Sequence, residues 1–211
     1  MIGIVAHTAR AEQAQQLMET VGAAYTSIDN GTLGCERNHH RTWQWLSQHN
    51  HGDWCVVLED DAVPVPGFTS QLPAALDAAP SPIVSLYLGQ KRPPHWMNAV
   101  RKATETATSH NACWITGKQL LHAVAVAVRA ELLDDMLTAA ANSRRPWDYR
   151  IGEFAQRTKE TIAYSWPSLV NHADTESVTR HQDGQPRTPG RVAWKTGTRT
   201  HWTPASVPIQ P

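Results

Sequence analysis

The sequence predicts an α/β fold in which a mixed, mostly parallel sheet is flanked by helices. Short apolar runs rich in β-branched residues recur along the chain, and such runs are typical of buried strands. Segments with apolar residues at helical spacing separate several of these runs, an alternation that produces βαβ units. The length of 211 residues fits one domain of good size with a short appendage.

The first third of the chain predicts three strands and two helices. Strands are expected at residues 2–6, 24–28 and 54–59, with helices at about 11–21 and 34–46. Gly22 is expected to end the first helix. Because this start is a βαβ unit, its two strands should be parallel.

The rest of the chain predicts further strands and helices and two irregular stretches. Strands are expected at residues 83–88, 112–115, 122–128 and 161–165, and helices near 68–76, at 130–141 and from 146 onward. Residues 89–108 show no clear period, which predicts a long loop. We divide the chain into a domain at 1–175 and a basic C-terminal extension at 176–211, containing Pro and Trp, that wraps the domain.

Composition excludes several functional classes. The 19 Lys and Arg residues balance 19 Asp and Glu residues, so no global field directs the chain to nucleic acid or to a membrane. No apolar run reaches the ~18 residues that a membrane span needs. Cys35, Cys55 and Cys113 lie far apart, which predicts a reducing, cytoplasmic location and no disulfide framework.

Three consecutive acids, Glu59, Asp60 and Asp61, follow the apolar strand at 54–58. Carboxylates at the end of a buried strand are costly unless a cation neutralises them. Glu59 and Asp61 should point the same way on an extended chain, and hard oxygen ligands suit Mg²⁺ or Mn²⁺. Such an ion can stabilise the charge on a leaving nucleoside diphosphate. The alternative is a solvated acidic strand end or helix cap.

Two short motifs carry a family resemblance. Leu58-Glu59-Asp60-Asp61-Ala62 resembles the metal motif of GT-A glycosyltransferases, closest to the family 25 type. Gly34-Cys35, followed by Asn38-His39, resembles that family's Gly-Cys-x-x-Ser-His segment, with Asn38 in place of the Ser. The resemblance covers about residues 1–175, and the short chain is similar to compact glycosyltransferases of phage genomes. It implies a GT-A (Rossmann-like) fold and, for a phage protein, the host cytoplasm.

The resemblance also implies an activity, a cofactor and a set of site residues. The implied activity is that of a hexosyltransferase, which moves a sugar from a nucleotide-sugar donor, a UDP-sugar by preference, to an acceptor hydroxyl. Asp61 and Glu59 would bind Mn²⁺ or Mg²⁺, and His172 is a candidate third ligand or else a loop histidine. The candidate donor-binding residues are His7, Thr8, Arg10, Asp29, Asn38 and Asp60.

Family 25 enzymes invert the anomeric centre, so a general base is expected. Asp148 is the candidate because it follows Pro146 and Trp147 at a predicted helix start, and Glu153 is the fallback. The alternative for Asp148 is an ordinary first-turn acid that stabilises the helix dipole. Trp147 could stack on a sugar or belong to the core.

The C-terminal segment suggests an acceptor. Five basic residues stand there against Asp183, with Trp194 and Trp202 interleaved: Arg180, Arg187, Arg191, Lys195 and Arg199. Basic residues with aromatics between them are typical of nucleic-acid grooves, to which Arg144 and Arg145 could add. The favoured acceptor is therefore a hydroxymethylated pyrimidine in phage DNA, flipped from the stack. A glycan or protein hydroxyl is the alternative acceptor. In that case the C-terminal segment would be a solvated basic tail or would bind the phosphates of the donor.

A hypothesis of another class is a non-catalytic module that binds a nucleotide sugar. Intact Glu59, Asp60 and Asp61 argue against it, and release of nucleoside diphosphate from a donor with Mn²⁺ discriminates the two. A nucleotidyltransferase is disfavoured because the sequence has no Gly-rich phosphate loop.

Overall fold

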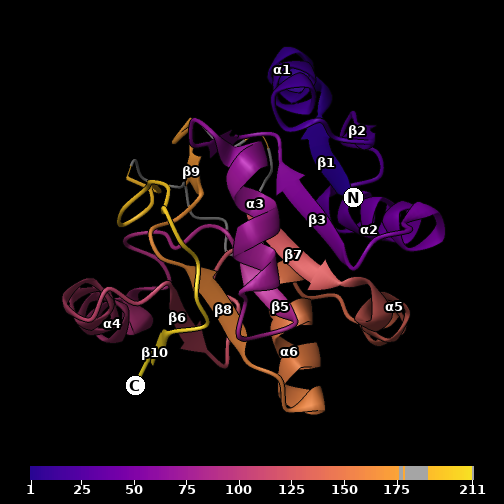
Figure 1. The fold of residues 1–211 in the computed structure, drawn as a ribbon. Helices are drawn as coiled ribbons and strands as arrows, with labels where there is room; N and C mark the ends of the chain where they lie inside the picture. The colour runs from indigo at the N-terminus through magenta and orange to yellow at the C-terminus, as the bar shows by residue number, and fades with distance from the viewer. Residues whose placement is uncertain (176–177, 179–189, 211) are drawn as a thin grey trace.

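The computed structural model describes residues 1–175, 178 and 190–210, and its centre is an eight-stranded sheet (Figure 1). The strand order is β10-β6-β8-β5-β7-β3-β1-β2. The bounds are β1 Ile2–His7, β2 Tyr25–Asp29, β3 Trp54–Glu59, β5 Ile83–Ser85, β6 Trp114–Gly117, β7 Ala125–Arg129, β8 Ile162–Ser165 and β10 Ser206–Pro208. A separate two-stranded sheet pairs β4, Ala62–Pro64, with β9, Val170–His172.

The sheet is mixed and mostly parallel, as the sequence predicts. Strand β1 pairs in parallel with both β2 and β3, and the pairs β5–β8 and β6–β10 are also parallel. Strand β7 runs antiparallel to β3 and β5, and β6 runs antiparallel to β8. The predicted fold class, an α/β sheet flanked by helices, is therefore confirmed.

Helices cover both faces of the sheet (Figure 1). Their bounds are α1 Ala11–Val21, α2 Cys35–His49, α3 Phe68–Asp77, α4 Met97–Ser109, α5 Leu133–Ala141 and α6 Trp147–Thr158, with single 3-10 turns at Thr8–Arg10, Pro94–Trp96 and Ala130–Leu132. Buried side chains of α1 and α3 belong to one hydrophobic cluster, and those of α2, α4, α5 and α6 belong to the other. Two apolar layers thus enclose the central strands.

The first βαβ unit forms where the sequence predicts it. Ala14, Leu17 and Val21 bury one face of α1, and Gly22 ends the helix with a φ of 64°, a left-handed conformation that favours glycine. Gly3 of β1 serves a second purpose, because a Cβ atom there would lie 2.9 Å from the Thr42 methyl group. The absent side chain lets α2 lie close against β1, which brings the start of α2 to the end of the sheet.

The expected loop at 89–108 is wrong over its second half, where the chain forms α4. Val100, Ala103, Thr104 and Ala107 are buried at helical spacing. Alanine and threonine differ little in hydrophobicity from the residues on the exposed face, so the helical period of buried residues does not stand out in the sequence. The fourth strand is also shorter than expected and ends at Ser85.

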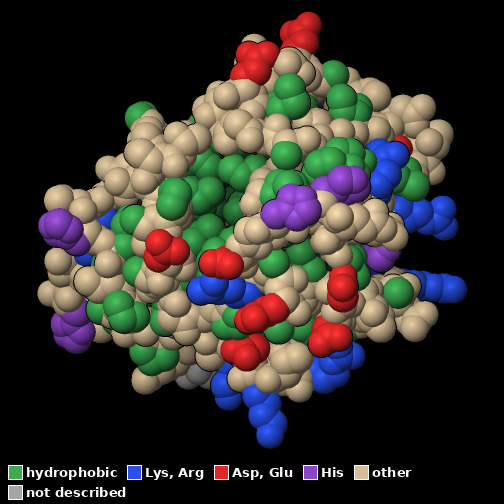
Figure 2. Space-filling view, turned by 45° about the vertical axis from the view of Figure 1, so that its right-hand side comes forward, with side chains coloured by type: hydrophobic (Ala, Val, Ile, Leu, Met, Phe, Trp, Pro, Cys, Tyr) green, Lys and Arg blue, Asp and Glu red, His purple; other side chains and the backbone are tan. Residues whose placement is uncertain are grey.

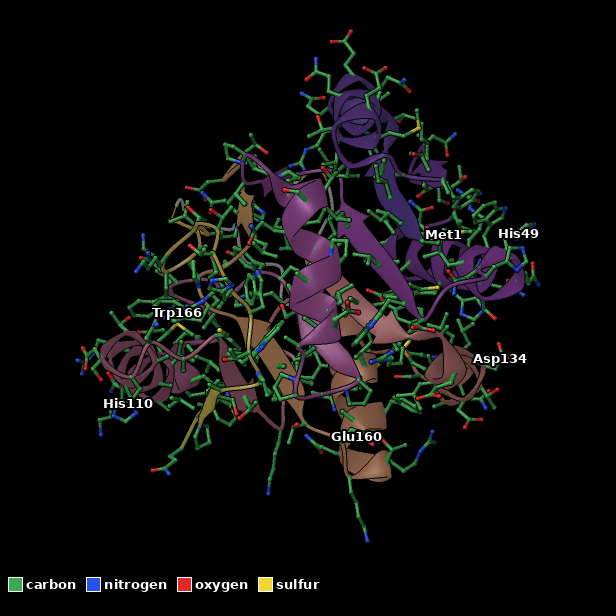
Figure 3. The ribbon with its side chains drawn as sticks, in the orientation of Figure 1. Met1, His49, His110, Asp134, Glu160 and Trp166 are labelled. Carbon is green, nitrogen blue, oxygen red and sulfur yellow. The ribbon has the colours of Figure 1, made fainter. Side chains whose placement is uncertain are left out.

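The described part of the C-terminal segment packs closely on the sheet and helices. Strand β10 extends the main sheet beside β6, although irregular structure was expected there. The Arg199 guanidinium donates hydrogen bonds to the carbonyls of Asn111, Ala112 and Trp166. Trp166 (labelled in Figure 3) also donates to Thr108 at the end of α4. Arg199 thus ties this segment to the loop after α4.

No helix in the described ranges is both long enough and apolar enough to span a bilayer.

Candidate active site

A pocket of about 470 Å³ opens at the carboxyl ends of β1 and β3. The chain continues from β1 to β2 on one side and later places β3 on the other side, so this edge is a topological switch point. Open α/β sheets bind ligands at such points. Of the predicted site residues, the pocket lining includes His7, Arg10, Asp29, Asn38, Glu59, Asp60, Asp61, Trp147, Asp148, His172 and Arg191.

The acidic cluster is neutralised largely by the protein's own side chains. Arg10 Nη1 lies 2.9 Å from Asp60 Oδ1 and 2.6 Å from Asp61 Oδ2. Asp60 also accepts a hydrogen bond of 2.8 Å from the backbone N–H of His7. The positive charge that the sequence led us to expect at these two carboxylates is thus supplied by Arg10. If Arg10 also contacts a diphosphate, as the sequence predicts, it must do so while it stays bound to Asp60 and Asp61.

Glu59 has a different partner. Its Oε1 atom lies 3.2 Å from His39 Nε2, and His39 is 2% exposed. Burial lowers the pKa of His39, but the Cys35 thiol and the Glu59 carboxylate outweigh this effect and raise it to about 10. Glu59 therefore belongs to an ion pair with a buried histidine, which engages its Oε1 atom.

His172 supports Asp61 from the other side. Its Nε2 atom lies 3.2 Å from Asp61 Oδ2, while its Nδ1 atom accepts a hydrogen bond of 2.8 Å from the backbone N–H of Asp174. A neutral imidazole has one lone pair, so this network places the proton on Nε2 and makes it a donor. Burial raises the pKa of Asp61, but His172 and Arg10 outweigh this effect and lower it to about 2.

A divalent cation fits this cluster at one atom. Asp61 Oδ1 is buried and has no hydrogen-bond partner among the described residues. Mg²⁺ is commonly held by one or two carboxylates together with substrate phosphates, so one such oxygen is sufficient. In the described ranges, no three His, Cys, Asp or Glu side chains group as a metal cage. The predicted joint ligation by Asp61, Glu59 and His172 stays a prediction, and within this cluster Asp61 Oδ1 is the carboxylate oxygen that is buried without a hydrogen-bond partner among the described residues.

A second group of acids lines the pocket at the starts of α2 and α6. Burial and the nearby Glu59 and Glu36 carboxylates raise the pKa of Asp148 to about 6, against the opposing hydrogen bond from the Tyr149 N–H. Burial likewise raises the pKa of Glu36. The Trp147 indole N–H donates to the Glu36 carbonyl at 2.7 Å, which fixes the two helix starts against each other. Asp148 is thus a half-buried acid with a pKa of about 6.

Several predicted donor-binding residues are occupied by local hydrogen bonds. Both carboxylate oxygens of Asp29 accept backbone N–H groups, from Leu33 and Gly34. Burial raises the pKa of Asp29, but these N–H groups outweigh it and lower the pKa. The Asn38 amide donates to the carbonyls of Ala6 and Ser27, so it joins β1 to β2. Both residues line the pocket chiefly as parts of its wall.

Five predicted residues lie outside this pocket. Thr8 borders a neighbouring shallow depression with Asn30 and Arg41. Glu153 pairs with Arg145 at 2.5 Å on the exposed side of α6. Arg144 is exposed, and Trp194 packs against the core. Arg180, Asp183 and Arg187 lie outside the described residues.

Other pocket residues were missed by the sequence analysis. Glu36 and His39 could have been found, because they share the first turns of α2 with Cys35. Tyr87, Arg92 and His122 come from strand ends and loops that the sequence does not connect. His122 Nε2 donates to the Arg92 carbonyl at 3.0 Å, and burial lowers the pKa of His122 to about 4, so its ring stays neutral.

Comparisons with solved structures give distant matches. No family model matches the sequence and no curated protein matches it, so the family 25 resemblance stays a prediction. The crystal structure of A197 from STIV is 11% identical, covers 95% of this chain and 98% of that chain, and has a TM-score of 0.48. These values describe a similarity in the arrangement of elements and carry no functional argument.

Two further solved structures are similar at a lower level. The inositol-1-phosphate CTP transferase from T. maritima is 6% identical, with a TM-score of 0.39 over 77% of this chain and 64% of that chain. A glycosyltransferase involved in glycosylation of the major capsid of PBCV-1 is 12% identical, with a TM-score of 0.38 over 74% of this chain and 75% of that chain.

Proposed function

We propose that this protein is a glycosyltransferase that transfers a sugar from a nucleotide-sugar donor to an acceptor hydroxyl with inversion. One observation carries the proposal. One pocket at the switch point of the sheet holds a fixed acidic cluster around Asp61 and a half-buried carboxylate, Asp148, whose pKa is about 6. A diphosphate anchor and a general base are the two groups that such a transfer needs.

The side of the pocket around Asp61 suits the donor. Arg92 and Arg191 line the pocket together with His7, so guanidinium groups are available to a diphosphate. Asp61 Oδ1 would hold Mn²⁺ or Mg²⁺, which would offset the negative charge of the departing nucleoside diphosphate. Arg10 and His172 keep Asp61 ionised and fix its orientation. A UDP-sugar is the donor that we favour.

Asp148 serves the acceptor. Its carboxylate takes the proton of the acceptor hydroxyl as the oxygen forms its bond to the anomeric carbon. The bond from that carbon to the diphosphate oxygen breaks, and the nucleoside diphosphate leaves with the electron pair. A pKa of about 6 leaves Asp148 mostly deprotonated at neutral pH and a stronger base than an ordinary aspartate.

The acceptor side favours a neutral hydroxyl compound, such as a glycan or a protein side chain, over DNA. Glu36, Glu59 and Asp148 line this side, and carboxylates repel a phosphodiester backbone. The described part of the C-terminal segment uses Arg199 and Trp202 for internal hydrogen bonds. On the face shown in Figure 2, acidic and basic side chains are interspersed and form no continuous basic patch. A hydroxymethylated pyrimidine in DNA is therefore the second candidate.

The test is mass spectrometry after incubation with Mn²⁺, a panel of UDP- and GDP-sugars, and three acceptor classes. These classes are oligosaccharides, hydroxylated peptides and hydroxymethylated DNA. We expect released nucleoside diphosphate and one acceptor class heavier by a hexose. Asp61→Asn should abolish transfer, whereas Ala at this position would leave the buried Arg10 charge with fewer partners. Transfer at the wild-type rate by the Asp61→Asn variant would refute the proposed role of Asp61 in holding the metal and the diphosphate.

The competing hypothesis, a non-catalytic nucleotide-sugar module, predicts a different result. Such a module would bind UDP-sugar in a calorimeter and release no nucleoside diphosphate, with any acceptor. The raised pKa of Asp148 favours the enzyme, because a binding module has no need of a carboxylate with a raised pKa in its pocket.

A further inference from the structure

Arg191 is held at the pocket by two contacts of its own. Its carbonyl accepts a hydrogen bond of 2.6 Å from the hydroxyl of the buried Tyr87. Its guanidinium donates from Nη2 to the Thr175 carbonyl at 2.7 Å. A guanidinium has several further N–H donors, and those of Arg191 make no hydrogen bond to the residues that the structure describes. Arg191 therefore lines the pocket with a positioned guanidinium whose remaining donors are available to an anion.

Asp174 fixes the backbone of the same arginine. Its Oδ1 atom accepts the Arg191 N–H at 2.9 Å, and its Oδ2 atom accepts the Gly190 N–H at 2.5 Å. Asp174 has a φ of 53°, a left-handed conformation that is uncommon for residues other than glycine. Conformations of this kind gather at ligand-binding sites, where the surrounding contacts impose them. Both oxygens of the carboxylate thus hold the turn that carries Arg191.

The backbone of Asp174 contacts the metal side of the proposed site. Its N–H donates to His172 Nδ1 at 2.8 Å, and His172 Nε2 lies 3.2 Å from Asp61 Oδ2. One residue therefore connects Asp61, through His172, with Arg191. A carboxylate that holds a cation and a guanidinium that binds phosphate oxygens act on the same diphosphate only if their relative positions are fixed.

We propose that Asp174 is a positioning residue, which sets the Arg191 guanidinium to bind a diphosphate group in the pocket. The assignment of this diphosphate to a nucleotide-sugar donor rests on the proposed function. Asp174 touches no phosphate itself, because its carboxylate is an anion whose two oxygens already accept backbone N–H groups. A guanidinium that is fixed before binding loses less entropy when the anion arrives, so Asp174 should strengthen binding through Arg191.

Calorimetry with inorganic pyrophosphate and Mg²⁺ tests the proposal without a sugar or an acceptor. Asp174→Asn is the informative variant, because asparagine tolerates the left-handed φ and keeps the N–H that serves His172. It replaces one accepting oxygen by an NH₂ group. We expect the dissociation constant for pyrophosphate to rise by about tenfold. The sign is diagnostic, because removal of a negative charge would by itself favour an anion.

A double-mutant cycle separates positioning from a general structural effect. Arg191→Gln should weaken pyrophosphate binding at least as much as Asp174→Asn does. In the Arg191→Gln background, Asp174→Asn should change the dissociation constant by less than about twofold, because the guanidinium that it positions is absent. An equal effect of Asp174→Asn in both backgrounds would overturn the proposal, and so would a wild-type protein that does not bind pyrophosphate.

Tyr87→Phe serves if Asp174→Asn does not fold, because it removes only the hydroxyl that donates to the Arg191 carbonyl. It should weaken pyrophosphate binding by a smaller factor, and only while Arg191 is present. An unchanged affinity in the folded Tyr87→Phe and Asp174→Asn variants would refute the positioning of Arg191. If pyrophosphate binding depends on Asp174 through Arg191 but no sugar is transferred, the transfer is refuted and the role of Asp174 stands.

Discussion

At the scale of single residues, the pocket holds carboxylates in opposite electrostatic situations. Asp61 is surrounded by donors that lower its pKa to about 2, while desolvation and the nearby acids raise the pKa of the half-buried Asp148 to about 6. Two acids whose environments move their pKa values apart can take different roles in one reaction. Asp61 remains an anion under all ordinary conditions, and Asp148 exchanges a proton near neutrality.

Asp148→Asn should reduce transfer and raise stability. A base must be deprotonated, so wild-type activity should rise with pH through about 6 and then level off. The variant should lose this dependence and about 10²- to 10⁴-fold in kcat. The raised pKa stabilises the fold below about pH 4, an effect that is lost as pH rises through about 6.

Removing the carboxylate should therefore stabilise the protein at pH ~8, by up to about 3 kcal/mol. Thermal unfolding and pH–rate profiles measure both effects. Glu153→Gln is the matched control on the same helix, because Glu153 is exposed and paired with Arg145, and it should change neither quantity. If Glu153→Gln loses transfer and Asp148→Asn retains it, Glu153 and not Asp148 is the general base.

Arg10→Gln should destabilise the protein in a pH-dependent way. The variant leaves Asp60 and Asp61 without their shared cation, at a cost of about 3–5 kcal/mol at neutral pH. The depressed pKa of Asp61 contributes stability above about pH 4 that is lost as pH falls through about 2. Acid should therefore weaken the variant less than the wild type in urea unfolding curves. If acid lowers the free energy of unfolding equally in the variant and in the wild type, Arg10 does not lower the pKa of Asp61.

At the scale of elements, the segment after Gly190 behaves as part of the fold. Arg199 donates to three backbone carbonyls and to the Asn111 side chain. Trp202 donates to Gln71 of α3. The interleaving of basic and aromatic residues that indicated a nucleic-acid groove is, for these residues, an arrangement that attaches the segment to the domain.

Arg199→Lys should destabilise the protein although it keeps the charge. A lysine has no planar fork and cannot make all four hydrogen bonds, so a loss of about 2–3 kcal/mol is expected. Lys195→Gln, at an exposed position nearby, removes a charge and should change stability by less than about 0.5 kcal/mol. Chemical denaturation checks both. If the two variants are equally stable, Arg199 does not attach the segment.

At the scale of the whole molecule, the last strand closes the sheet against β6. Val207 is buried and Ser206 is exposed, so adjacent positions of β10 face inward and outward. Trp114 of β6 donates its indole N–H to the Thr203 carbonyl, and its ring lies 5.3 Å from that of Trp202. The C-terminal residues therefore cover apolar surface that the rest of the chain leaves open.

Deletion of residues 190–211 should abolish cooperative thermal unfolding or leave the protein insoluble, because it exposes the Trp114 region. A finer comparison uses two neighbouring substitutions. Val207→Lys should destabilise by about 2–4 kcal/mol, whereas Ser206→Lys should be nearly neutral. A deletion variant with an unchanged melting temperature would show that the segment is dispensable.

The sequence by itself determined the α/β architecture, because periodicity and glycine act locally. The bounds of α1, the end at Gly22 and the start of β3 all follow from residues a few positions apart. It also placed Asp61 and Asp148 at the ends of elements, and the structure brings both residues to one pocket. It failed at α4, where alanine and threonine form the buried face, and at β10, which pairs across the sheet.

Only the tertiary structure decided the partners of the charged groups. Arg10 reaches Asp60 and Asp61 across fifty residues, and His172 reaches Asp61 from the far end of the domain. Whether an acidic cluster needs an external cation depends on such contacts, because a carboxylate's charge can be balanced by any neighbour in space. The pKa of Asp148 depends in the same way on Glu36 and Glu59, which share its pocket but not its stretch of chain.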